Sequence, residues 1–125
     1  MSSIIEAVNQ LWYNSILDLD IDFLNQKIGF KTISIDNGIK KYHSVNISFF
    51  SELMWISWQN DVTLNECKYL EMTSISECDI KLSSKNKWIS QFENQFNLAI
   101  EIWSKVLLIN AERITIDGID YILKE

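Results

Sequence analysis

The sequence predicts a mainly β (α+β) fold, with one N-terminal helix and about seven or eight short antiparallel strands in a sandwich or partly open barrel. Three observations lead to this class. Several short segments alternate apolar and polar residues, as strands with one buried face do. Turn signals separate the segments. Strand and helix patterns do not alternate along the chain, which argues against a doubly wound fold.

The helix is expected over residues 3–13. Ser2 or Ser3 caps it, and Glu6 stands three residues after Ser3, in the position of a capping box. The expected buried face follows helical spacing: Ile4, Ile5, Val8, Leu11 and Trp12.

From residue 16 the apolar period changes to two. In ILDLDIDF, residues 16–23, the predicted inward set is Leu17, Leu19, Ile21 and Phe23. The phase changes within residues 27–35, which we interpret as a bulge near residues 31–32. Asp36-Asn37-Gly38 is a tight-turn signal. The returning strand carries Val45, Ile47 and Phe49 on one side.

The second half reads as further strands. Residues 51–58 are a strand or a short helix, since the period does not decide between them, and residues 64–82 are one or two strands. Leu98, Ile100 and Ile102 alternate, and an apolar run follows at residues 106–109. The turn Asp117-Gly118 then closes a C-terminal hairpin.

Length and composition indicate one globular domain over residues 1–125. The first residues lack the features of a secretory signal, and no apolar stretch is long enough to span a membrane. With only two cysteines, we expect a cytoplasmic protein with free thiols. The net charge of −6 disfavours nucleic acid and favours a basic protein as partner. The oligomeric state is left open.

The three aspartates Asp18, Asp20 and Asp22 are the first candidates for a site. A calcium loop needs Gly where Phe23 stands and Glu where Gly29 stands, so this motif fails. Carboxylates two apart on a strand are separated by about 6.5–7 Å, which suits an acid/base pair, but no cleft or sugar-stacking aromatic accompanies them. We favour the solvated face of a strand, which can also be a docking surface.

Other reactive residues give no catalytic or metal site. His43 is the only histidine, and we expect it to be an isolated surface residue. Cys67 and Cys78 lack the further ligands that zinc requires. Basic residues gather around the first hairpin, where we expect a solvated surface: Lys27, Lys31, Lys40 and Lys41. Three isolated glycines cannot form a phosphate loop, so no cofactor is expected.

Tryptophans are the most informative large side chains. Trp55 and Trp58 are candidate interface anchors. Trp103 is either another anchor or a core residue packed against the N-terminal helix, and we favour burial.

Residues 97–123 resemble the small bacterial proteins called YxiG-like, and they also resemble small immunity-type proteins found beside polymorphic toxins. The residues that carry the resemblance are Leu98, Glu101–Ser104, Glu112, Ile114, Ile116, Asp117-Gly118, Tyr121 and Leu123. The resemblance implies a β-rich bacterial domain that neutralises a toxin partner, and it brings no catalytic residue.

The sequence therefore favours a non-enzymatic protein-binding domain, an immunity protein that masks a basic toxin. Acidic residues would steer the association and a tryptophan would anchor it: Asp18, Asp20, Asp22, Glu66, Glu71, Glu77, Asp79, Trp55 and Trp58. The alternatives are a β-barrel-like module that binds an apolar small molecule, and a structural or interaction protein.

Overall fold

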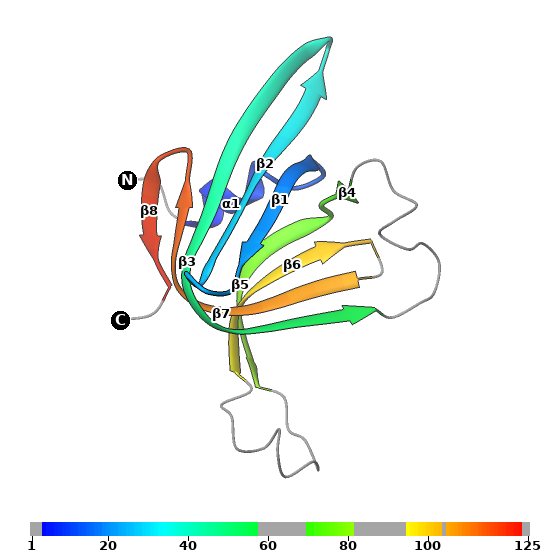
Figure 1. The fold of residues 1–125 in the computed structure, drawn as a ribbon. Coiled ribbons are helices and arrows are strands. Elements are labelled where there is room, and N and C mark those ends of the chain that lie inside the picture. The colour runs from blue at the N-terminus through cyan, green and yellow to red at the C-terminus, as the bar shows by residue number, and fades with distance from the viewer. Residues whose placement is uncertain (1–3, 58–69, 82–94, 104, 124–125) are drawn as a thin grey trace.

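A computed structural model describes residues 4–57, 70–81, 95–103 and 105–123. Within these ranges the chain is mainly β, as the sequence predicts, with one short helix (Figure 1). The elements in chain order are α1 (Ile4–Asn9), β1 (Ser15–Asp22), β2 (Lys27–Asp36), β3 (Ile39–Ser57), β4 (Leu70–Glu71), β5 (Ser74–Lys81), β6 (Gln95–Ile102), β7 (Lys105–Ile116) and β8 (Ile119–Ile122).

All strand pairs in the described part of the chain are antiparallel and form one sheet that is not closed. The strand order is β4-β1-β2-β3-β7-β6-β5, and β8 pairs with β7 beside this path. The two ends of the order are neighbours in the chain, since only residues 72–73 separate β4 from β5. Met72 accepts a hydrogen bond from the Tyr13 amide, and the Thr73 amide donates to Glu101 in β6. The strands therefore form one open antiparallel sheet.

The main core lies on the inner side of this sheet. It joins Leu98, Ile100 and Ile102 of β6, which are all fully buried, to residues of every long strand. β7 is buried on both faces from Lys105 to Ala111, which explains its apolar run. Its second face belongs to a smaller cluster formed by Phe96, Ala99, Val106 and Leu108.

The helix is shorter than predicted, and part of its predicted buried face is wrong. Ala7, Val8 and Leu11 are buried, whereas Ile5 and Trp12 are exposed. After residue 9 the amides of residues 11 and 12 bond three residues back, so the chain tightens and helical spacing no longer applies. The predicted caps at residues 2–3 lie outside the described residues.

A bulge lies in β1, not at residues 31–32 as predicted. Leu17 is opposite Lys31 and Asp20 is opposite Gly29, so two residues of β1 face one residue of β2. Asp18 has a φ of 52°, which places it in the left-handed region at the bulge. The pairing of β2 with β3 continues without a shift from residue 27 to residue 36.

The bulge also corrects the predicted inward face of β1. Before the bulge, Ile16 is buried and is paired with the buried Thr32, so Leu17 points outward with Lys31. After the bulge, Ile21 pairs with the buried Ile28 and packs against the core. The prediction that Leu17 and Ile21 lie on the same inner face is therefore wrong.

The two predicted hairpin turns are confirmed. Asn37 and Gly38 have φ values of 51° and 79°, and Asp117 and Gly118 have values of 51° and 83°. Two consecutive residues with positive φ are what a type I′ hairpin requires.

The undecided segment at residues 51–57 is the second half of β3. Figure 1 shows β3 bending between its two halves, where Phe49 has a φ of 59° and the register with β7 shifts between Phe50 and Glu52. Phe49 is consequently exposed, against the prediction that it joins Val45 and Ile47. Trp103 is also exposed, at 42%, so its predicted burial is wrong. It directly follows β6 and has a φ of 56°.

Candidate functional site

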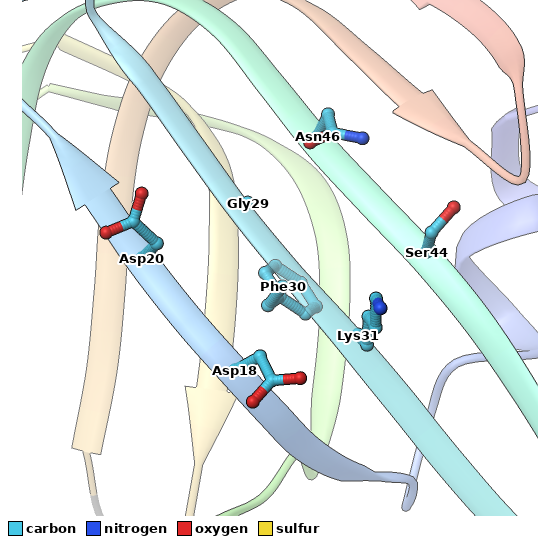
Figure 2. A pocket seen from close by; sticks show the side chains of 7 residues that line it. All are labelled: Asp18, Asp20, Gly29, Phe30, Lys31, Ser44 and Asn46. Atoms are coloured by element: carbon cyan, nitrogen blue, oxygen red, sulfur yellow. The ribbon is translucent and has the colours of Figure 1, made fainter.

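A hollow lies on the outer face of β1, β2 and β3 (Figure 2). Its volume is about 250 Å³. β1 contributes Asp18 and Asp20, and β3 contributes Ser44 and Asn46. β2 passes between them with Gly29, Phe30 and Lys31. We call this site the outer hollow.

Gly29 leaves the outer hollow open in the middle. It is opposite Asp20 on one side and Asn46 on the other. A Cβ atom at residue 29 would lie 3.1 Å from Asn46 Oδ1, which is tighter than ordinary van der Waals contact. Any side chain at this position would therefore occupy the space between the two neighbouring strands.

Asp18 and Asp20 are both exposed at the rim of the outer hollow, as the prediction of a solvated face requires. Neither carboxylate forms an ion pair or a side-chain hydrogen bond with another residue in the part of the chain that the structure describes. Lys31 shares the lining and reduces the local negative charge to one unit. The rim therefore offers two solvated acceptors for a positively charged group.

Asp22 has a different role from the other two aspartates. Its Oδ1 accepts the Asn25 amide at 3.1 Å and its Oδ2 accepts Asn25 Nδ2 at 2.8 Å. These hydrogen bonds from Asn25 hold the pKa of Asp22 below its ordinary value. The carboxylate closes the turn between β1 and β2 and does not line the outer hollow.

A second, apolar pocket also takes part of its lining from β1. Its volume is about 350 Å³. Residues from β1 and the turn after it face residues from β3, β6 and β7 across this pocket, and the lining consists of Leu19, Ile21, Phe23, Leu53, Trp55, Ile102 and Leu107. Leu19 stands in the chain between Asp18 and Asp20 but lines the apolar pocket, so β1 serves both sites.

The other predicted binding residues are spread over the molecule. Trp55 lines the apolar pocket and not the outer hollow. Glu71 lies in β4, opposite Ser15 of β1. Glu77 and Asp79 are exposed on β5, at the other end of the strand order from β4. Two further predicted residues, Trp58 and Glu66, lie outside the described residues.

Gly29 and Asn46 were not predicted from the sequence as site residues. Isolated glycines carry no pattern of their own, and only the strand register brings these two residues beside the aspartates. The one available signal was a glycine inside a predicted strand, which often marks a close approach of backbone or ligand.

Comparison with protein families identifies the family to which the chain belongs. The family model of the YxiG-like protein matches residues 4–121. The chain belongs to the YxiG-like family. This match extends the resemblance at residues 97–123 to most of the chain, including both sites on β1. A search of curated proteins found no match.

His43 of this YxiG-like chain is not the isolated surface residue that the sequence predicts. Its side chain is only 10% exposed, and Nδ1 lies 2.6 Å from Asp117 Oδ2. Asp117 Oδ1 also accepts the Ser44 amide at 2.9 Å. Burial raises the pKa of Asp117, but the hydrogen bonds from His43 and Ser44 outweigh it and lower the pKa overall. The pair fastens the β7–β8 turn to β3.

These residues do not form a nucleophilic triad. Ser44 is adjacent to His43 in β3, and neighbouring side chains of a strand point to opposite faces. Ser44 lines the outer hollow, whereas His43 pairs with the buried Thr32.

The other groups in the described ranges of this YxiG-like chain that bear on reactivity are a thiol and the metal-binding types of side chain. Cys78 is a half-buried free thiol, and burial raises its pKa. Cys67 lies outside these ranges. No three His, Cys, Asp or Glu side chains in the described residues come together as metal ligands. No helix among them has the length and apolar character needed to cross a membrane.

Proposed function

We propose that this YxiG-like chain is a non-enzymatic protein-binding domain that docks a basic protein through the outer hollow, as an immunity protein does with a toxin. The observation that carries the proposal is that Asp18 and Asp20, at the rim of a cavity opened by Gly29, have no side-chain partner among the described residues. Because the bulge turns both carboxylates to one outer face, they can act together on one partner side chain.

The outer hollow suits an arginine or lysine side chain of the partner. The two carboxylates accept charge-assisted hydrogen bonds, each worth about 1.5–3 kcal/mol. The Ser44 hydroxyl and the Asn46 amide oxygen supply further acceptors on the opposite strand. The net charge of −6 would raise the association rate with a basic partner at low salt.

The test begins with a pull-down from cells of the source organism, comparing wild type with Asp18→Asn/Asp20→Asn. Asn tolerates the left-handed conformation at residue 18, so the fold should be retained. The control variant is Glu101→Gln/Glu112→Gln, which removes the same charge from exposed residues of β6 and β7. Retained proteins are identified by mass.

The captured protein is then purified and its affinity is measured at low and high salt. We expect a basic protein whose affinity falls with salt and with the Asp18/Asp20 variant, and not with the control. Gly29→Ala should also weaken binding, because the added methyl group occupies the outer hollow. Co-expression should restore the growth of cells that the partner inhibits. Equal binding by wild type and the two charge variants would reject the proposed surface, and a harmless partner would reject the immunity role.

A further inference from the structure

We propose that the apolar pocket is a binding site for an uncharged apolar small molecule of about two aromatic rings. This site is separate from the outer hollow, since the two share no lining residue. The proposal does not depend on the docking of a basic protein.

The pocket leaves large apolar side chains exposed around a concave surface. Leu19 and Trp55 are each 40% exposed and Phe23 is 67% exposed. The deeper part of the lining belongs to the core, since Ile102 and Leu107 are buried. Single exposed apolar residues are common, but several of them gathered around one cavity mark a ligand site.

The size of the apolar pocket selects a small molecule rather than a protein. A dry apolar cavity of about 150 Å³ holds one benzene molecule. A volume of about 350 Å³ therefore accommodates a molecule roughly twice the size of benzene. Protein interfaces use about 20–30 residues on each side, far more than the lining of this pocket.

The lining also defines the polarity of the ligand. Each lining side chain is apolar apart from the indole nitrogen of Trp55, so a charged ligand would lose its hydration without gaining a partner. Trp55 and Phe23 offer aromatic faces on which a planar ligand can pack. The Phe23 ring is held in place by an edge-to-face contact with Phe50, with ring centres 5.9 Å apart.

The experiment uses the uncharged dye N-phenyl-1-naphthylamine, whose fluorescence rises in apolar surroundings, and unlabelled naphthalene as a competitor. Wild type should give a saturable signal that naphthalene displaces. Leu53→Trp should fill the apolar pocket and Trp55→Ala should remove one wall, and each should weaken dye binding by about tenfold or more. Circular dichroism and the urea midpoint report whether each variant is folded.

Two controls separate this site from other surfaces. Trp103→Ala removes a tryptophan that is 42% exposed and does not line the apolar pocket, so dye binding should be unchanged. Asp18→Asn/Asp20→Asn should also bind the dye as wild type does, which distinguishes this site from the outer hollow. Absence of a saturable signal, or equal loss in Trp55→Ala and Trp103→Ala, would overturn the proposal.

Discussion

The backbone conformation of Asp18 gives a stability prediction that can be worked out from the structure. Its φ of 52° is left-handed, a conformation that costs a typical L residue about 1–2 kcal/mol. Asp and Asn adopt it more readily than other residues because their short polar side chains bond locally, and Gly adopts it freely. A β-branched residue should bear the full cost. We therefore expect Asp18→Val to lower the free energy of unfolding by about 1–2 kcal/mol.

Asp20→Val is the matched control. It removes the same charge from the same strand, but Asp20 pairs regularly with Gly29 and has no positive φ. Because valine is favoured in strands, the change should be smaller than about 0.5 kcal/mol. Asp18→Gly should be as stable as wild type or more so. Urea unfolding followed by tryptophan fluorescence measures all three, with unchanged m-values. Equal losses in Asp18→Val and Asp20→Val would show that the left-handed conformation of residue 18 is not the cause.

The remaining predictions concern single contacts. Asp117 has a lowered pKa, so its contribution to stability is fully present above pH ~4 and is lost as pH falls through the lowered pKa. Wild type should exceed Asp117→Asn in unfolding free energy at pH 7, and the gap should narrow steadily as pH falls below ~4. A gap that stays constant over this range would show that the charged carboxylate is not its source. The Asn97 side chain forms hydrogen bonds with the carbonyl and the amide of Ala111, at 2.7 and 3.1 Å. Asn97→Ala should therefore lower the free energy of unfolding, measured in urea, by about 2 kcal/mol. A loss under about 0.5 kcal/mol would show that these hydrogen bonds contribute little. Trp12 Nε1 donates a hydrogen bond to a β5 carbonyl at 2.9 Å. Trp12→Phe should therefore lower the free energy of unfolding by about 1 kcal/mol in the same assay. An unchanged urea midpoint would show that this hydrogen bond does not stabilise the fold.

Local sequence determines the features that were predicted correctly. The turns at Asn37-Gly38 and Asp117-Gly118 depend on residues that accept positive φ, and both appear where the sequence indicates. The alternation of residues 98–102 also describes one strand correctly, because β6 pairs regularly with β7 from Leu98 to Ile102.

The bulge could not be predicted, because it depends on pairing between strands. ILDLDIDF alternates perfectly, yet the register places two of its residues opposite Phe30 alone. The apparent phase change in residues 27–35 has another cause. Ile35 is exposed near the end of the β2–β3 hairpin, where it pairs with Lys40.

The candidate sites were predictable only in part. The exposure of Asp18 and Asp20 was predicted correctly from their alternation with apolar residues, although the bulge produces it. The outer hollow also needs Gly29, which reaches the aspartates through the register of β1 with β2. The apolar pocket joins Leu19 to Leu107, residues whose proximity no local pattern can show.

In the structure, a bulge in β1 turns Asp18 and Asp20 to the outer hollow, while Leu19 lines the apolar pocket. Cross-strand backbone nuclear Overhauser effects from Gly29 test it most directly. With the bulge in place, we expect contacts between Gly29 and Asp20 together with contacts between Lys31 and Leu17. Contacts between Gly29 and Leu19, with Lys31 still opposite Leu17, would show a regular strand without a bulge.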